Sequence, residues 1–300
     1  MPKGYFSSKG KASRVYKIRP TKVLSVKDMV KYAFDLSEQF GLPVIVRTTT
    51  RVSHMRGVVE FGDVADNSSN NDNHWKRGHF NKDPSKYVPV PAFAWDMHVR
   101  LWDKIHKIEE ISNKSDLNCE IALGDNKSYG LIASSSAYNY AHDVIKFNGL
   151  DINILKLGFS YPFPYEKVAE FLKDLDEVFV VEEVDPIMEK DTLATIGMNS
   201  LNVKVHGKLD GTFPMCLEFN SDIVGDGFNK ILNFKEESEI KYSSSLEKLK
   251  DNLPSRAPVL CAGCPHRAMY YGINKAIEEL GLKSSDVIFA SDIGCYTLGI

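Results

Sequence analysis

Thiol side chains at two places late in this sequence carry its clearest chemistry. Three of the five cysteines belong to the segments Cys261-Ala262-Gly263-Cys264-Pro265-His266-Arg267 and Ser291-Asp292-Ile293-Gly294-Cys295-Tyr296. The second segment follows the short apolar run 287–290, whose β-branched and aromatic residues predict a buried strand. In an α/β fold, backbone amides are free to meet a ligand at the carboxyl end of a strand. We therefore expect Cys261, Cys264 and Cys295 to converge there, close to a bound cofactor.

A Cys-x-x-Cys motif has several uses, and the rest of the sequence helps to weigh them. A structural zinc site needs four ligands in two close pairs, but the other cysteines, Cys119 and Cys216, stand alone. A thioredoxin-type site has the motif at a helix N-terminus after a strand, which leaves Cys295 unexplained. An iron–sulfur cluster needs about four thiolates. Three cysteines in two segments therefore leave cluster binding and an incidental role both open.

The composition of the chain limits its class. Its 300 residues are 43% hydrophobic and 26% charged, which is typical of a folded protein of roughly two domains. A net charge of −3 gives no reason to expect nucleic acid or an anionic membrane surface as partner. No apolar run approaches the roughly 20 residues of a membrane span, and the first residues carry no apolar signal region. We expect a cytoplasmic protein whose thiols are not paired in structural disulfides.

Residues 127–205 predict one β-α-β-α-β block. Strands are expected over 129–133, 152–157 and 177–182, with helices over 137–147 and 165–172. Strands that alternate with helices form a parallel sheet with right-handed crossovers, so the predicted fold class is α/β. Glu182, Glu183 and Asp185 follow the last strand, and we favour an acidic group stabilised by the next helix dipole over a catalytic role.

A second helix–strand unit comes earlier in the chain. An amphipathic helix is expected over 25–40, ended by Gly41 and followed by a strand over 43–46. The polar run Arg47-Thr48-Thr49-Thr50-Arg51-Val52-Ser53-His54 comes directly after that strand. Arg47, Arg51 and His54 are candidates to bind a substrate carboxylate, because arginine pairs with carboxylates through two parallel hydrogen bonds. A turn held by surface ion pairs explains the same residues equally well.

Two further motifs have competing interpretations. Gly225-Asp226-Gly227 resembles a Mg²⁺-binding turn, but it follows polar residues in a stretch, 206–255, that we interpret as a linker. We therefore do not assign it a metal. His266 and Arg267 open a predicted helix over 266–280, where free amides favour an anion such as a diphosphate. An exposed capping pair at the same place is an equal alternative.

The order of these motifs resembles a known family. The two thiol segments are similar to the thiamine-diphosphate-binding domain of indolepyruvate:ferredoxin oxidoreductase alpha subunits, whose pattern is close to C-P-G-C-P-H-R…G-D-I-G-C-Y-T-L-G. Ala262 and Ser291 depart from that pattern and leave every thiol in place. The run 47–54 resembles the end of the family's pyrimidine-binding domain, and Leu157-Gly158-Phe159-Ser160-Tyr161-Pro162-Phe163-Pro164 stands where the family has L-G-x-x-Y-P-x-P.

The resemblance covers nearly the whole chain and implies its organisation. It implies parallel-sheet domains of the thiamine-diphosphate enzyme type with a central transketolase C-terminal-like domain. The implied segments are the C-terminal part of a pyrimidine-binding domain (1–61), a loop and linker (62–115), the transketolase C-terminal-like domain (116–205), a linker (206–255) and the start of the thiamine-diphosphate-binding domain (256–300).

The resemblance also implies an activity. The family enzyme is an oxidoreductase that decarboxylates indolepyruvate and other aryl pyruvates to acyl-CoA, with ferredoxin as electron acceptor. It implies thiamine diphosphate, Mg²⁺ and 4Fe-4S clusters as cofactors, and the beta subunit, ferredoxin, coenzyme A and an aryl pyruvate as partners. The implied cofactor-binding residues are Cys261, Gly263, Cys264, His266, Arg267, Asp292, Gly294 and Cys295, with the three cysteines as candidate cluster ligands. A sibling 2-oxoacid:ferredoxin oxidoreductase subunit and a truncated, non-catalytic assembly partner remain open as alternatives.

The same resemblance places two functional segments outside these residues. The glutamate that activates thiamine is expected before Met1, and the metal-binding G-D-G…N segment after Ile300. Thiamine chemistry needs the aminopyrimidine and the diphosphate held by two different domains. We therefore expect the 300-residue chain alone not to oxidise indolepyruvate.

Overall fold

The computed structural model describes residues 16–18, 23–59, 81–123, 128–234, 252, 259–290 and 293–299. Contacts along the chain divide it into two units, Met1–Glu237 and Ser238–Ile300. No helix among the described residues is long and apolar enough to cross a membrane.

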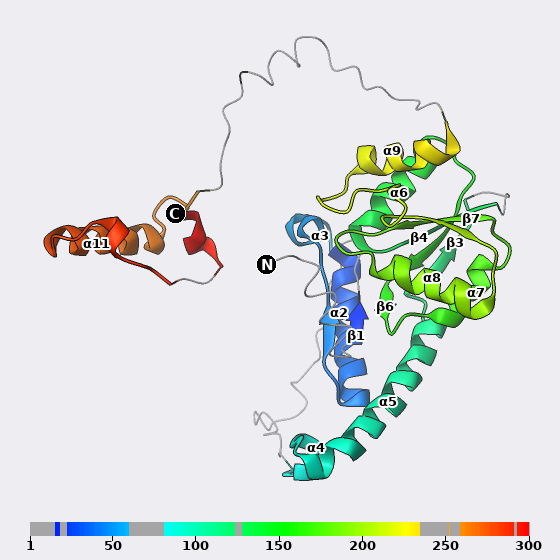
Figure 1. The fold of residues 1–300 in the computed structure, drawn as a ribbon, viewed down its shortest axis with the longest axis horizontal. Coiled ribbons are helices and arrows are strands. Elements are labelled where there is room, and N and C mark those ends of the chain that lie inside the picture. The colour runs from blue at the N-terminus through cyan, green and yellow to red at the C-terminus, as the bar shows by residue number, and fades with distance from the viewer. Residues whose placement is uncertain are drawn as a thin grey trace, which may run out of the picture. The chain divides into compact units, whose positions relative to one another are not determined.

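A five-stranded sheet with the order β3-β5-β4-β7-β8 forms the centre of the first unit (Figure 1). The middle strands β5, β4 and β7 and the edge strand β8 run parallel, and β3 joins the other edge antiparallel to β5. The parallel sheet predicted over 127–205 is therefore confirmed. The strands are β3 (Asn118–Ile121), β4 (Tyr129–Ala133), β5 (Asn153–Leu157), β7 (Glu177–Val181) and β8 (Lys204–His206).

Helices cover both faces of this sheet (Figure 1). On one face, α6 (Ser135–Phe147) and α9 (Ser221–Leu232) enclose a core that includes Leu131, Ile154 and Phe179. On the other face, α7 (Tyr165–Leu172) and α8 (Ile187–Asn199) pack on Ile132, Leu155 and Val180. The chain crosses from β4 to β5 on the first face and returns to β7 on the second. The winding therefore reverses between β4 and β7, and ligands of open α/β sheets bind at the carboxyl end of such a switch point.

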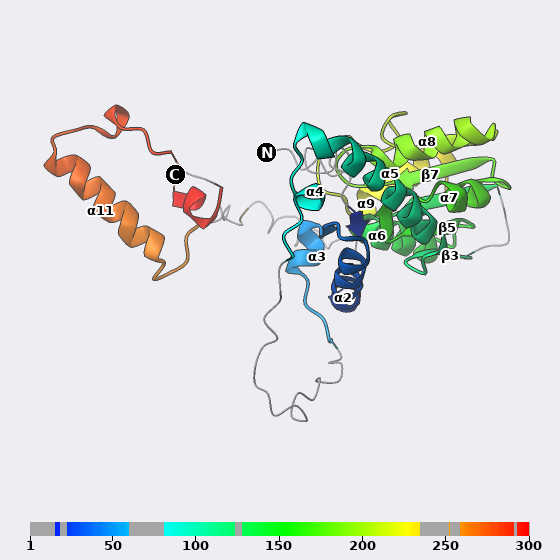
Figure 2. The same ribbon diagram turned by 90° about the horizontal axis from the view of Figure 1, so that it is seen from below.

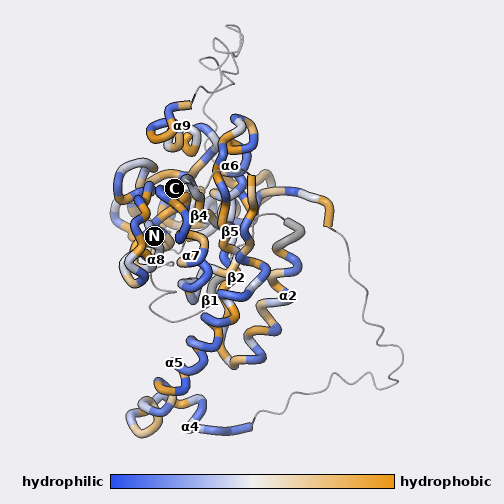
Figure 3. Tube along the Cα trace, turned by 90° about the vertical axis from the view of Figure 1, so that its right-hand side faces the viewer, coloured by the Kyte–Doolittle hydropathy of each residue, from blue (hydrophilic) through white to orange (hydrophobic). Residues whose placement is uncertain are grey.

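A smaller sheet of order β2-β1-β6 lies in the same unit. Its strands are β1 (Tyr16–Ile18), β2 (Val44–Val46) and β6 (Phe159–Tyr161), and α2 (Val23–Phe40) ends at Gly41 in a left-handed conformation with φ of 58°. The predicted helix–glycine–strand unit is thus confirmed. Hydrophobic and hydrophilic residues alternate along α2 (Figure 3), as expected for a helix with one buried face.

The long helix α5 (Pro91–Lys114) joins the two sheets. It begins after the short helix α4 (Pro84–Tyr87) and runs toward the larger sheet (Figure 2). Only its second half contributes buried residues, Ile105, Ile108 and Ser112. These contact a core made with Met29 of α2 and Phe159 of β6. The helix lies in the range predicted as loop and linker, and this packing makes its second half part of the folded unit.

The linker predicted over 206–255 is wrong for 206–234. Phe213, Phe219 and Phe228 are almost completely buried and belong to the core on the α6 side of the sheet. Gly225-Asp226-Gly227 lies inside α9 rather than in a linker, with Asp226 exposed. The prediction failed because Phe213 and Phe219 lie among Gly, Asp and Asn residues, and because Gly225-Asp226-Gly227 interrupts the apolar helical spacing around Phe228.

The second unit contains α11 (Pro265–Glu279) and two short 3₁₀ helices, η2 (Ser284–Asp286) and η3 (Cys295–Gly299). The helix predicted over 266–280 is confirmed as α11. The strand predicted over 287–290 is wrong, since these residues form no strand and Ile288 is 95% exposed. A strand needs a neighbour for its backbone hydrogen bonds, and no described residue of this unit forms one.

Candidate functional site

Polar residues follow the carboxyl ends of β4 and β7, and in each of these two segments one residue has a strained backbone conformation. Ser135 follows β4 with φ of 56°, and Val184 follows β7 with φ of 74°, a left-handed conformation that a β-branched residue rarely adopts. Such strain is found preferentially at ligand and switch sites. The short helix α3 (Thr50–His54), which comes after β2, contacts α6 at this edge (Figure 1).

A chain of hydrogen bonds fixes α3 to the switch point. Ser136 Oγ donates to Glu183 Oε2 at 2.9 Å, and Thr49 Oγ1 lies 3.0 Å from Ser136 Oγ. Because a serine hydroxyl carries one proton, Thr49 is the donor of the second bond. Thr49 also caps α3 by accepting from Val52 N–H, and Phe219 N–H donates to Glu183 Oε1 at 3.3 Å. Glu183 therefore connects α3 with the segment that precedes α9.

A cavity of about 530 Å³ lies between α3 and α6, and we call it the α3–α6 pocket. Two of the three predicted substrate-binding residues, Arg51 and His54, line it. Tyr140 and His142 add an aromatic ring and a second imidazole from α6. The full lining is Arg51, Val52, His54, Met55, Ser136, Asn139, Tyr140, His142 and Asp143.

Charges in and beside the pocket are partly paired. Arg51 Nε lies 3.5 Å from Glu218 Oε1, and both side chains are substantially exposed. His142 Nδ1 lies 3.6 Å from Asp143 Oδ1. Burial raises the pKa of the Tyr140 hydroxyl, and Glu183 raises it further. This hydroxyl is therefore protonated near neutral pH and can donate a hydrogen bond.

Arg47, the third predicted substrate-binding residue, does not line the pocket. Burial lowers the pKa of its guanidinium, while Glu183, Glu182 and Asp185 act in the opposite direction. The charge of Arg47 therefore interacts with the acidic residues that follow β7. Glu182 in turn accepts the N–H groups of Met188 and Glu189 in the first turn of α8. The helix-start interpretation of the acidic group is confirmed for Glu182.

The first thiol segment forms a tight turn into α11. Cys264 N–H donates to the carbonyl of Cys261 at 3.2 Å, and Gly263 between them has φ of 72°, which favours glycine. Arg267 donates from Nη2 to the carbonyl of Leu260 at 2.7 Å. The Arg267 side chain thus holds the turn in place. The thiols of Cys261 and Cys264 are exposed and half-buried, respectively.

The second thiol segment packs against the same helix. The His266 and Tyr296 rings meet edge to face with centroids 5.6 Å apart, and the Tyr270 hydroxyl donates to the carbonyl of Tyr296. Gly294 N–H donates to Thr297 Oγ1 within this segment. The structure therefore places the segment of Cys295 against α11, although not at the end of a strand as predicted. Asp292 lies outside the described residues.

The thiols do not form a metal site in the described part of the chain. No group of three or more His, Cys, Asp or Glu side chains there has an arrangement that could hold a metal ion. Three thiols are the right donors for an iron–sulfur cluster, but Cys261, Cys264 and Cys295 do not gather around one point. Their role as cluster ligands thus remains a prediction that this geometry does not support.

Comparison with known proteins gives a consistent result. The chain is 46% identical to the indolepyruvate oxidoreductase subunit IorA of Methanothermobacter thermautotrophicus over 94% of its own length. The corresponding subunits of Archaeoglobus fulgidus and Pyrococcus horikoshii are 37% and 38% identical over 97% and 94% of the chain. The chain is related to the IorA subunits. It spans 44% of the length of the M. thermautotrophicus subunit, and no family model matches it.

A solved structure gives only a partial overlap. A 2-oxoglutarate:ferredoxin oxidoreductase from Magnetococcus marinus covers 47% of this chain with 14% sequence identity and a TM-score of 0.35, and the chain covers 23% of it. An overlap of this size carries no argument about fold or function. The resemblance inferred from the motifs therefore rests on its agreement with the IorA sequences.

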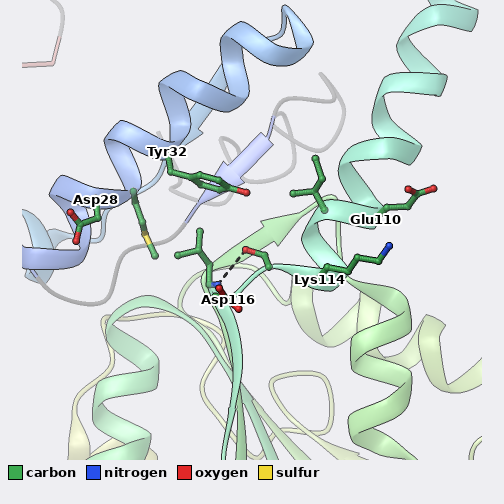
Figure 4. A pocket seen from close by; sticks show the side chains of 9 residues that line it. Asp28, Tyr32, Glu110, Lys114 and Asp116 are labelled. Atoms are coloured by element: carbon green, nitrogen blue, oxygen red, sulfur yellow. Dashed lines mark hydrogen bonds between the residues drawn. The ribbon is translucent and has the colours of Figure 1, made fainter.

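A second cavity of about 540 Å³ lies between α2 and the end of α5, and none of the predicted site residues lines it (Figure 4). Tyr32 points from α2 toward α5, while Asp28, Glu110, Lys114 and Asp116 surround the opening. Burial raises the pKa of the Tyr32 hydroxyl, and a hydrogen bond with Ser115 lowers it.

Sequence reasoning missed three residues of the α3–α6 pocket region. Ser136, Tyr140 and Glu218 carry no motif that marks them in a single IorA-like sequence. Ser136 could have been found from its place in the turn after the strand predicted over 129–133, because that turn becomes the switch point of the sheet. Glu218 is brought to Arg51 by packing of Phe219, and no local pattern predicts that contact.

Proposed function

We propose that this chain is part of an enzyme that oxidatively decarboxylates indolepyruvate and other aryl pyruvates to acyl-CoA, with ferredoxin as acceptor. The observation that carries the proposal is the 46% identity to an indolepyruvate oxidoreductase subunit over 94% of the chain. In this proposal a beta subunit, ferredoxin and coenzyme A are its partners.

We propose further that the α3–α6 pocket receives the 2-oxo acid. Arg51 offers a guanidinium to the carboxylate, and His54 lies in the same wall. Tyr140 offers a ring for the aryl group and a protonated hydroxyl for a hydrogen bond. Ser136 and Thr49 hold α3 in place, so that Arg51 is oriented before the ligand arrives.

The second unit is proposed to contribute to the thiamine diphosphate site. The start of α11 has no side-chain cap on its amides, which suits a diphosphate, and Gly263 keeps the turn before it narrow. Decarboxylation chemistry is supplied by the thiamine when bound. In this proposal His266 and Gly294 line the diphosphate, Asp292 and Mg²⁺ complete the site, and Arg267 maintains the turn.

Replacing Arg51 with glutamine should weaken binding of phenylpyruvate to the purified chain by about tenfold or more. The reason is the loss of a charge-assisted hydrogen bond to the carboxylate. Isothermal titration calorimetry measures the affinity. Arg56→Gln is the matched control, because Arg56 is an exposed arginine beyond α3 that does not line the pocket.

Equal affinities for the wild type and Arg51→Gln would contradict the proposed carboxylate site. An absence of phenylpyruvate binding in the wild type would contradict it as well. A loss of affinity in Arg56→Gln as large as in Arg51→Gln would show that general positive charge, rather than the α3–α6 pocket, attracts the acid.

A further inference from the structure

Glu218 reaches Arg51 from an unusual stretch of backbone. The preceding residue, Leu217, has φ of 78° and a side chain that is 79% exposed. The following residue, Phe219, is buried, and its N–H donates to Glu183. Lys208 Nζ lies over the Phe219 ring, 4.5 Å from the ring centroid. The buried ring and the N–H bond of Phe219 therefore hold the backbone next to Glu218 in place.

The same hydrogen-bonded pair holds both partners of the Arg51–Glu218 contact. Ser136 and Glu183 fix α3, which carries Arg51, through Thr49. Glu183 fixes the segment of Glu218 through Phe219. The 3.5 Å contact therefore joins two segments that are positioned independently of it. A carboxylate is thus held beside the guanidinium that the proposed ligand would use.

This placement changes the charge that a ligand meets. With histidines counted as neutral, the pocket lining carries one positive charge, on Arg51, and one negative charge, on Asp143. Glu218 adds a second negative charge next to Arg51. A ligand with one carboxylate can share or replace the Glu218 contact. A ligand with a second carboxylate adds negative charge to a site where Asp143 and Glu218 already outnumber Arg51, and like charges repel.

We propose that Glu218 is a specificity-determining residue of the α3–α6 pocket, which it restricts to 2-oxo acids with a single carboxylate and an apolar or aryl body. This inference rests on the proposed function of the pocket. Glu218 acts through Arg51 and through repulsion, and it takes no part in the chemical step.

The test compares phenylpyruvate with 2-oxoglutarate, a dicarboxylic 2-oxo acid, by calorimetry on the purified wild-type chain and on Glu218→Gln. We expect the wild type to prefer phenylpyruvate by about tenfold. In Glu218→Gln the affinity for 2-oxoglutarate should rise roughly fivefold more than that for phenylpyruvate. Asp226→Asn is the matched control, because it removes an exposed negative charge from α9 outside the pocket. Glu218→Ala serves as a second variant, and circular dichroism checks that all are folded.

The outcomes separate the inference from the function on which it rests. If the wild type binds phenylpyruvate and Arg51→Gln does not, but Glu218→Gln leaves the ratio of the two affinities unchanged, the role of Glu218 is overturned and the pocket assignment stands. An equal change of the ratio in Asp226→Asn also overturns it, since total charge would then explain the preference. If the wild type binds neither acid, the pocket assignment itself fails.

Discussion

Replacing Asn118 with leucine is expected to lower the free energy of unfolding by about 3 to 5 kcal/mol. Asn118 is completely buried in β3. Its Nδ2 donates to the carbonyls of Ser112 and Phe159, each at 2.9 Å, and its Oδ1 accepts from Phe159 N–H at 2.8 Å. The side chain therefore connects the end of α5, the edge of the large sheet and β6. Leucine has a similar volume but leaves these buried groups unpaired.

Urea unfolding followed by circular dichroism measures the effect. Asn199→Leu is the matched control, because Asn199 donates a single bond, to the Thr195 carbonyl, from an exposed position at the end of α8. In Asn199→Leu the free energy of unfolding should fall by less than about 1 kcal/mol. Asn118→Asp keeps the acceptor for Phe159 N–H but turns an oxygen toward two carbonyls, and it should also destabilise. If Asn118→Leu costs no more than Asn199→Leu, the linking role of this side chain is wrong.

Replacing Gly227 with alanine should destabilise the chain by about 2 to 3 kcal/mol. Gly227 lies inside α9, and a Cβ atom there would stand 2.2 Å from Cε1 of Phe213. Phe213 cannot move away easily, since it is buried and packs edge to face on Phe228 at 6.1 Å between centroids. The steric cost outweighs the gain of about 1 kcal/mol that alanine brings to a helix.

Gly197→Ala should change the free energy of unfolding in the opposite direction, and it serves as the control. Gly197 lies in α8 with no atom within 4 Å of an added Cβ. Alanine should therefore stabilise the chain by up to about 1 kcal/mol, because only helix propensity changes. The same urea experiment measures both variants. If Gly227→Ala is as stable as the wild type, α9 does not pack on Phe213 as described.

The central sheet could be predicted from the sequence because its signals are local. Strand and helix patterns over 127–205 alternate with clear breaks, and a parallel sheet follows from that order. Gly41 likewise marks the end of α2. These features depend on a few neighbouring residues, which a single sequence displays.

The parts that could not be predicted depend on contacts between distant residues. The core role of Phe213 arises only when α9 packs on the sheet, because Phe213 lies in no periodic pattern. Within α9, Ile223, Val224, Phe228, Ile231 and Leu232 have helical spacing, but Gly225-Asp226-Gly227 interrupts it and makes the range look like a linker. The contact of Glu218 with Arg51 depends on that same packing. The run 287–290 has strand-forming residues, but β-propensity alone cannot supply the neighbouring strand. For the site, residue type identified Arg51 and His54, while only the fold could separate them from Arg47.

Binding of an aryl 2-oxo acid through its carboxylate to Arg51 defines the proposed role of the α3–α6 pocket. A crystal structure of the chain with phenylpyruvate tests it most directly. We expect a carboxylate oxygen about 2.7 to 3.2 Å from the Arg51 guanidinium, with the phenyl ring beside Tyr140. A ligand bound in the cavity between α2 and α5, or an α3–α6 pocket without ligand at saturating phenylpyruvate, would contradict it.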